Sequence, residues 1–212
     1  MIFYPLQSAA KFHNAGSTIM PIAVYIDSCA WNYLHENAID LLAKLPPSKY
    51  KLYITREVEI EIEAIPDNEK KKALKDYIRV NIRNAAIRTT AVFGFQTMDP
   101  DGTPSKVQVY GGFDQGTFQS PEDRKYYASP EVQAQLIGKS KKGSGLSDNQ
   151  TDASLAVRSF RAFILTNENP QKTGPLKMAA EKGGKVVYLS AQVENSELSL
   201  GQYLEFLLQK AI

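Results

Sequence analysis

The sequence contains a single cysteine, Cys29, among its 212 residues. One cysteine excludes an internal disulfide framework and a cysteine-based zinc site. The chain also lacks any run of about 18 apolar residues, which excludes a transmembrane helix. Its first residues lack the basic start and the long apolar core of a secretory signal. We therefore expect a soluble cytoplasmic protein.

An excess of charge of one sign is also missing, because the formal net charge is only +2. Any contact with nucleic acid must therefore come from local basic patches. The hydrophobic fraction of 43% is enough for a core, and the aromatic fraction of 10% argues against disorder. The length fits one elaborated domain or two small ones.

Three familiar catalytic motifs are absent or incomplete. No GxSxG sequence is present, so a hydrolase triad has no anchor. The GKS at 138–140 has Gln133 where a phosphate-binding P-loop needs glycine. The segment MDPDGTPSK (98–106) resembles the nucleophile motif of haloacid-dehalogenase-like phosphatases, but Gly94 and Gln96 interrupt the strand that should precede it. These observations disfavour each of the three activities.

Apolar runs alternate with amphipathic segments along most of the chain. The pattern predicts strands at 21–26, 51–55, 162–166 and 185–189, and helices at 28–45, 67–90, 149–161, 173–182 and 199–210. This alternation predicts an α/β protein of three layers, α/β/α, around a mainly parallel sheet. Residues 56–65 fit both a strand and a helix, and the local sequence leaves both open.

The composition changes between about residues 91 and 147, a segment that is rich in Gly, Pro, Ser and aromatic residues. The sequences VQVY and GTF on either side of GGFDQ predict a β-hairpin. Residues 138–145 form a basic Gly/Ser loop. We expect an N-terminal extension over 1–20 and a single domain over 21–212, with residues 91–147 as an insertion.

Four acidic residues lie where strands or helices would hold them rigidly. Asp27 and Glu168 follow predicted strands, Glu61 follows a third, and Asp152 lies in the first turn of a helix. Functional groups of open α/β sheets gather at the carboxyl ends of the strands. Clustered carboxylates raise one another's pKa values or require a cation. Mg²⁺ or Mn²⁺ is the natural neutraliser, and phosphodiester hydrolysis is the natural chemistry.

Three segments carry these residues in an order that resembles the PIN domain family, the fold of many metal-dependent ribonucleases, including bacterial toxin nucleases. They are YIDSCAWNYL around Asp27, ITREVEIEI with Thr55 and Glu61, and DASLAVRSFRAFILTNEN from Asp152 to Glu168. The resemblance covers roughly 21–90 and 146–212. Two departures are Cys29, where many members have Asn, and Glu168, which replaces the usual last Asp.

The resemblance implies an endoribonuclease with Mg²⁺ or Mn²⁺ as its cofactor. It implies that Asp27, Asp152 and Glu168 bind the metal and that Glu61 joins them in catalysis. Histidine is not needed, in keeping with only two histidines in the chain. RNA or DNA is the expected substrate, and an antitoxin or a second copy of the chain is an expected partner. The supporting residues would be Ser28, Thr166 and Asp148, and the residues that contact nucleic acid would be Lys139, Lys141 and Lys142.

Each of these residues also has a structural explanation that the sequence leaves open. Asp27 could simply cap the helix that follows it, and for Asp148 the N-cap of its helix is the favoured interpretation. Glu61 belongs to a run of four acidic residues that could form a solvated face, and the lysines could be ordinary loop charges. A PIN-like module that binds RNA or a protein partner without catalysis is therefore the alternative function.

Overall fold

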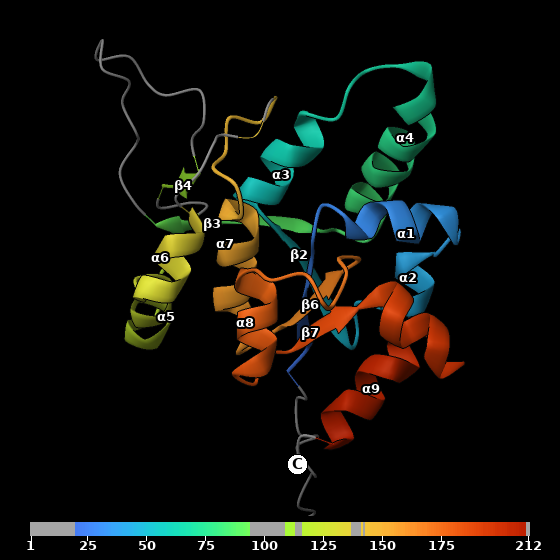
Figure 1. The fold of residues 1–212 in the computed structure, drawn as a ribbon. Coiled ribbons are helices and arrows are strands. Elements are labelled where there is room, and N and C mark those ends of the chain that lie inside the picture. Colours follow the sequence, from blue (N-terminus) through green and yellow to red (C-terminus); the bar gives the residue numbers. More distant parts are fainter. Residues whose placement is uncertain (1–19, 94–108, 113–115, 137–140, 142, 211–212) are drawn as a thin grey trace, which may run out of the picture.

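The computed structural model describes residues 20–93, 109–112, 116–136, 141 and 143–210 (Figure 1). The protein is an α/β fold with a central parallel sheet of strand order β4-β3-β2-β1-β6-β7, and β5 also pairs with β3. The strands are β1 (Ile22–Ile26), β2 (Tyr50–Thr55), β3 (Arg88–Phe93), β4 (Tyr110–Gly111), β5 (Gly116–Thr117), β6 (Phe163–Thr166) and β7 (Val186–Tyr188).

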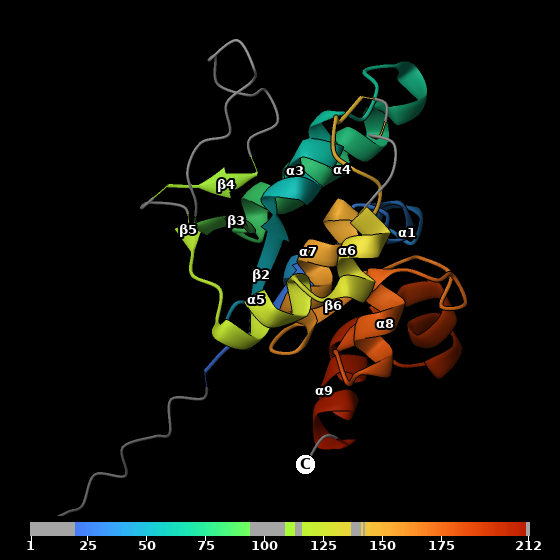
Figure 2. The same cartoon turned by 60° about the vertical axis from the view of Figure 1, so that its left-hand side comes forward.

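Helices cover both faces of this sheet (Figures 1 and 2). Helices α1, α2, α4 and α9 gather on one side, and α5, α6, α7 and α8 gather on the other. The helices are α1 (Ala30–Glu36), α2 (Leu41–Lys44), α3 (Arg56–Glu63), α4 (Glu69–Asn84), α5 (Pro121–Tyr127), α6 (Pro130–Leu136), α7 (Gln150–Ser159), α8 (Pro175–Glu181) and α9 (Leu200–Lys210), with a π-helical turn at Leu189–Val193 and a 3₁₀ turn at Glu194–Ser196.

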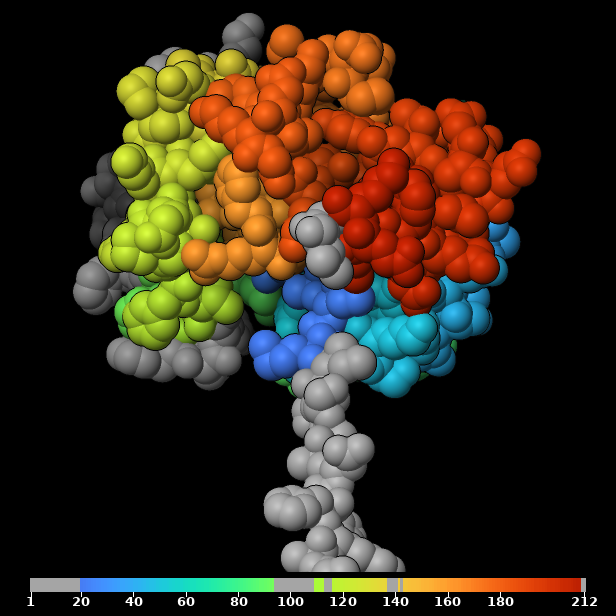
Figure 3. All heavy atoms as spheres, turned by 90° about the horizontal axis from the view of Figure 1, so that it is seen from below, coloured from blue at the N-terminus to red at the C-terminus, as the bar shows by residue number. Residues whose placement is uncertain are grey.

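The central strands are apolar because both of their faces are covered. Strand β1 lies between β2 and β6, in register through Val24 with Leu52 and with Phe163. Val24 and Ile26 are fully buried, and every residue of β6 is buried. The strands predicted from the apolar runs are confirmed. Figure 3 looks onto the amino ends of the strands, where β1 starts between α9 and the segment that contains α5.

The ambiguous segment 56–65 forms helix α3. Thr55 ends β2 and caps the helix, because its hydroxyl accepts a hydrogen bond from the Val58 N–H at 3.3 Å. Val58 and Ile60 are buried, while Pro66 follows the end of the helix. The Thr55 cap marks the start of the helix and Pro66 marks its end. The alternating pattern of residues 56–65 alone does not indicate a helix.

The structure corrects the prediction for residues 67–90. The helix ends at Asn84, and strand β3 starts at Arg88 after a turn in which Ala86 has a positive φ of 48°. The run Thr-Thr-Ala-Val-Phe at 89–93 is typical of a strand. The sequence alone favours a longer helix here, because basic residues continue from the helix to Arg88.

The hairpin predicted around 107–118 is also corrected. Strands β4 and β5 each pair with β3, in parallel, through Val92 with Tyr110 and with Thr117. Parallel pairing to a sheet edge requires no tight turn between the two short strands. The same region contains α5 and α6, which the sequence analysis did not predict. The phosphatase-like segment 98–106 and the extension 1–19 lie outside the described residues.

Within the part of the chain that the structure describes, no helix has the length and apolar character needed to cross a membrane.

Candidate active site

Asp27 stands at the carboxyl end of β1 and is almost fully buried, with 2% of its surface exposed. Its backbone N–H continues the pairing with β6 by donating to the Leu165 carbonyl at 2.9 Å. Its Oδ1 accepts from the Ser28 N–H at 2.6 Å, and its Oδ2 accepts from the Thr166 hydroxyl at 2.8 Å. The carboxylate is therefore fixed by groups of both β1 and β6.

Cys29 contributes to the site as a hydrogen-bonding group, a role that the sequence does not indicate. Its thiol donates to Asp27 Oδ2 over 3.0 Å, and its sulfur accepts from the Asn167 N–H at 3.2 Å. Burial, followed by the charge of Asp27, raises the pKa of the Cys29 thiol. The thiol is thus held protonated as a donor to the carboxylate.

Asp152 lies in the first turn of α7 with 7% of its surface exposed. Burial raises its pKa to about 7, and the charges of Asp27 and Glu168 add to the shift. The pKa of Asp27 is also raised, first by burial and then by the charges of Glu61 and Glu168, against the hydrogen bonds from Cys29 and Thr166. The charges of the four predicted carboxylates therefore act on one another at the carboxyl edge of the sheet.

Glu61 is the member of the acidic run that points to this site. Its Oε1 accepts from the Thr151 hydroxyl at 2.8 Å and from the Lys141 ammonium at 2.6 Å. Thr151 directly precedes Asp152, so this bond ties α3 to the start of α7. The pair Glu59 and Glu63 instead forms ion pairs with Arg56. The structure thus separates Glu61 from its neighbours, which the sequence could not do.

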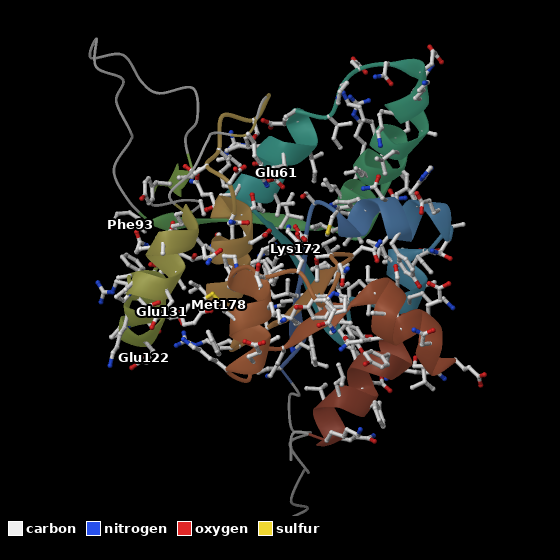
Figure 4. The ribbon with its side chains drawn as sticks, in the orientation of Figure 1. Glu61, Phe93, Glu122, Glu131, Lys172 and Met178 are labelled. Atoms are coloured by element: carbon white, nitrogen blue, oxygen red, sulfur yellow. The ribbon has the colours of Figure 1, made fainter. Side chains whose placement is uncertain are left out.

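Glu168 follows β6 and is ion-paired with Lys172. Its backbone N–H donates to the Thr166 hydroxyl at 3.2 Å, which places the loop after β6 next to Asp27. In Figure 4, Glu61 lies on α3 and Lys172 lies below it, in the loop between β6 and α8. Lys172 was not singled out from the sequence, and its spacing of four residues from Glu168 is the only signal that could have indicated the pair.

Two lysines partly neutralise the carboxylates. Burial lowers the pKa of Lys141, but the hydrogen bond and the charge of Glu61 raise it by more. The net effect is a raised pKa of Lys141. Glu168 has the same effect on the pKa of Lys172. Four carboxylates thus face two ammonium groups, which leaves two negative charges in excess when all are ionised. This excess disfavours ionisation of Asp27 and Asp152 and favours a further cation.

The donor set fits a hard divalent cation in its chemistry. Mg²⁺ binds oxygen ligands and commonly takes only one or two protein carboxylates together with waters. Within the described residues, however, no group of three or more His, Cys, Asp or Glu side chains is arranged to hold a metal ion. Glu61 and Glu168 are turned to their lysines instead. The predicted metal site through Asp27, Asp152 and Glu168 therefore stays a prediction.

The remaining predicted residues differ in their positions. Ser28 binds Asp27 mainly through its backbone N–H, because its hydroxyl lies 3.5 Å from Asp27 Oδ1. Asp148 is exposed in the turn before α7, and the N-cap position belongs to Asn149. Lys141 contacts the site, whereas Lys139 and Lys142 lie outside the described residues.

A cavity of about 410 Å³ opens beside the acidic residues, between α1, α3 and α4. Ala64, Ile65 and Leu74 give it an apolar wall. Its polar lining consists of Ser28, Cys29, Asn32, Glu61, Lys71, Lys141 and Ser144. The cavity therefore connects the carboxylates to a surface that offers both apolar contact and positive charge.

Comparison of the chain with protein-family models, with curated proteins and with solved structures found no match. Function is therefore inferred from the side chains of the site alone.

Proposed function

We propose that the chain is a PIN-like, metal-dependent endonuclease that hydrolyses phosphodiester bonds, with RNA as its preferred substrate. The observation that carries the proposal is the meeting of Asp27 and Asp152 at one sheet edge, where burial and neighbouring carboxylates raise the pKa of both. A protein gains no stability from such repulsion, and functional sites commonly hold groups with pKa values shifted in this way.

In this proposal Asp27 and Asp152 hold a Mg²⁺ or Mn²⁺ ion, and Glu61 and Glu168 support them. When bound, the ion would supply charge neutralisation for the phosphate and a water of lowered pKa. Thr166 and Cys29 keep Asp27 in place through their hydrogen bonds to Oδ2. Rigid orientation of an acidic ligand by outer donors is the common arrangement at metal sites.

The lysines suit a phosphate-bearing substrate. Lys141 and Lys172 are ion-paired with the carboxylates Glu61 and Glu168. An incoming phosphate can take over these ammonium groups, because charge-assisted hydrogen bonds form equally well to phosphate oxygens. The neighbouring cavity of about 410 Å³ gives a nucleotide beside the scissile phosphate an apolar wall and the side chain of Lys71.

One observation favours the alternative function, a PIN-like module that binds RNA or a protein partner without catalysis. The two lysines already compensate Glu61 and Glu168, and no three-ligand metal arrangement exists among the described residues. A lysine ammonium beside a carboxylate neutralises charge that a metal ion would otherwise neutralise. The two functions therefore differ in whether a divalent ion displaces these lysines.

A cleavage assay separates the two functions. Single-stranded RNA and DNA are incubated with Mn²⁺ and with the wild type, Asp152→Asn or the control Asp76→Asn, whose residue pairs with Arg79 on α4. We expect Asp152→Asn to lower cleavage at least about a hundredfold, because loss even of outer partners of metal ligands costs 10- to 100-fold. The control should keep the wild-type rate.

Equal metal-dependent cleavage by Asp152→Asn would overturn the assignment of the site. RNA binding by the wild type without any cleavage would favour the binding module instead.

A further inference from the structure

A second cavity, of about 160 Å³, lies apart from the acidic site, between α3, β3, β4 and the helices α5 and α7. It shares no lining residue with the cavity beside Asp27. Its walls combine the aromatic side chains Tyr110 and Tyr127, the amides Gln119 and Gln150, and the carboxylate of Glu57. The cavity thus gathers several polar side chains around the apolar Val92 and Val109, and polar groups that converge on a pocket fix the orientation of a ligand.

Glu57 is the informative residue of this cavity. Only 8% of its surface is exposed, and its Oε2 is buried without a hydrogen-bond partner among the described residues. Leaving a buried polar group unbonded costs free energy, and the cost is larger when the group is charged. The neighbouring Arg56 pairs with Glu59 and Glu63 rather than with Glu57. A cation that enters the cavity would therefore relieve an existing cost.

The other walls suit an organic cation better than a metal ion. Tyr127 lies close enough to Glu57 that burial and the charge of Glu57 raise the pKa of its hydroxyl. Aromatic rings beside a carboxylate favour planar or alkylated cations, which gain cation–π contact as well as an ion pair. A metal ion would need several oxygen ligands, and no cluster of three acidic, histidine or cysteine side chains exists within the described ranges.

The size of the cavity sets the size of the ligand. A cavity of about 150 Å³ admits benzene, which has six non-hydrogen atoms. Methylguanidinium has five and carries a planar face with several N–H donors, which match a carboxylate in bidentate fashion. The volume of about 160 Å³ therefore accepts the head group of an arginine or a free guanidinium compound.

We propose that this cavity is a binding site for a guanidinium cation, held by an ion pair to Glu57 beside the rings of Tyr110 and Tyr127. The site does not depend on the nuclease proposal, because none of these residues takes part in it. The guanidinium group can belong to a free small molecule or to an arginine side chain of a partner, and the two sources share the same chemistry.

The test compares two ligands of the same shape by NMR chemical-shift titration of the full chain. Methylguanidinium carries the charge, and N-methylurea is its neutral counterpart. We expect methylguanidinium to bind at least tenfold more tightly and to shift signals of residues that line the cavity. Glu57→Gln should remove this tenfold preference and leave the weak binding of N-methylurea unchanged. Glu63→Gln, on the exposed side of the same helix, is the matched control and should bind like the wild type.

Equal binding of the two ligands by the wild type, or an unchanged preference in Glu57→Gln, would overturn the proposal. Glutamine has the shape of glutamate, so we expect the variant to fold, with a melting temperature no lower than that of the wild type. If it does not fold, Tyr127→Leu replaces it and should weaken methylguanidinium binding several-fold.

A third ligand distinguishes the two sources. N-acetylarginine methylamide presents the guanidinium on a peptide backbone. If it binds as tightly as methylguanidinium, the site accepts an arginine side chain of a partner. If it is excluded while methylguanidinium binds, the site takes a free cation.

Discussion

Asp27 and Asp152 differ from ordinary surface acids because their carboxylate oxygens are buried, next to hydrogen-bond donors or other carboxylates. Asp27 accepts from the backbone N–H of Ser28 and the thiol of Cys29, which follow it in the chain, and from the hydroxyl of Thr166 at the end of β6. Asp152 has fewer such donors and is held at a pKa of about 7 by burial and by its acidic neighbours. At the scale of residues, the site is thus a set of carboxylates whose mutual repulsion is only partly relieved.

The burial of Asp152 and the charges of its acidic neighbours predict how stability depends on pH in the metal-free protein. The folded-state pKa of Asp152 lies above its unfolded value, so protonated Asp152 stabilises the fold below about pH 4, and this contribution is lost as the pH rises through about 7. Asp152→Asn removes the charge. We expect it to be more stable than the wild type at pH 8 by about 2 kcal/mol, or roughly 4–8 °C in Tm.

The measurement is thermal unfolding in a chelating buffer at pH 8 and at pH 5. The advantage of the variant should be clearly smaller at pH 5, where the wild-type carboxyl is largely protonated. A variant that is no more stable than the wild type at pH 8 would show that burial and the neighbouring charges do not destabilise the ionised Asp152.

The sequence indicated which residues belong to the site, but it did not indicate the hydrogen bonds and ion pairs that they form. Asp27, Thr166 and Glu168 could be predicted because each lies where an apolar run ends at polar residues. Such a change marks the end of a buried strand in a single sequence. The roles of Cys29 and Lys172 were missed, because a thiol as a donor and a lysine on a loop have no distinctive pattern. Whether Glu61 or a neighbour faces the site depends on the helical phase of α3, which the alternating sequence obscured.

At the scale of elements, the fold depends on helices that approach their neighbours closely. Gly201, in the first turn of α9, lies against the end of α2, and an added Cβ would stand 2.5 Å from the Lys44 carbonyl oxygen. The Tyr50 hydroxyl also donates to the Gly201 carbonyl at 3.2 Å, so α9 is fixed to the sheet at this point. The close contact therefore requires glycine.

We expect Gly201→Ala to destabilise the protein by about 1 kcal/mol. Alanine in place of glycine normally favours a helix by about 1 kcal/mol, but the clash with a backbone oxygen forces α9 to shift, and overpacking costs about 1–3 kcal/mol. The control is Gly174→Ala, where nothing lies within 4 Å of the added Cβ. Urea unfolding checks both variants, and equal stability of the two would contradict the tight packing of α9.

Strands with both faces covered were the elements that could be predicted, because their apolar runs admit few other structures. Strand β3 was missed because it follows α4 after a short turn and carries polar threonines. The pairing of β4 and β5 with β3 could not be predicted, since strands of two residues have no periodicity. Local sequence thus identified long buried elements and failed for short edge elements.

At the scale of the whole molecule, the parallel sheet brings together residues that are far apart in the sequence. Asp27 directly follows β1, Glu61 and Asp152 belong to α3 and α7, and Glu168 lies in the loop after β6, yet their charges act on one another at the carboxyl edge. The sheet order places β1 between β2 and β6, so the segments that carry the acids are direct neighbours. The gathering of these acids is a consequence of topology rather than of any one motif.

The central claim is that this gathering of carboxylates is a binding site for a divalent cation. Calorimetric titration of the metal-free protein with Mn²⁺ tests it most directly, with Asp27→Asn as the variant and Asp76→Asn as the control. We predict one saturable Mn²⁺ site in the wild type and in the control, and its loss in Asp27→Asn. Absence of Mn²⁺ binding in the wild type, or equal binding by Asp27→Asn, would contradict the claim.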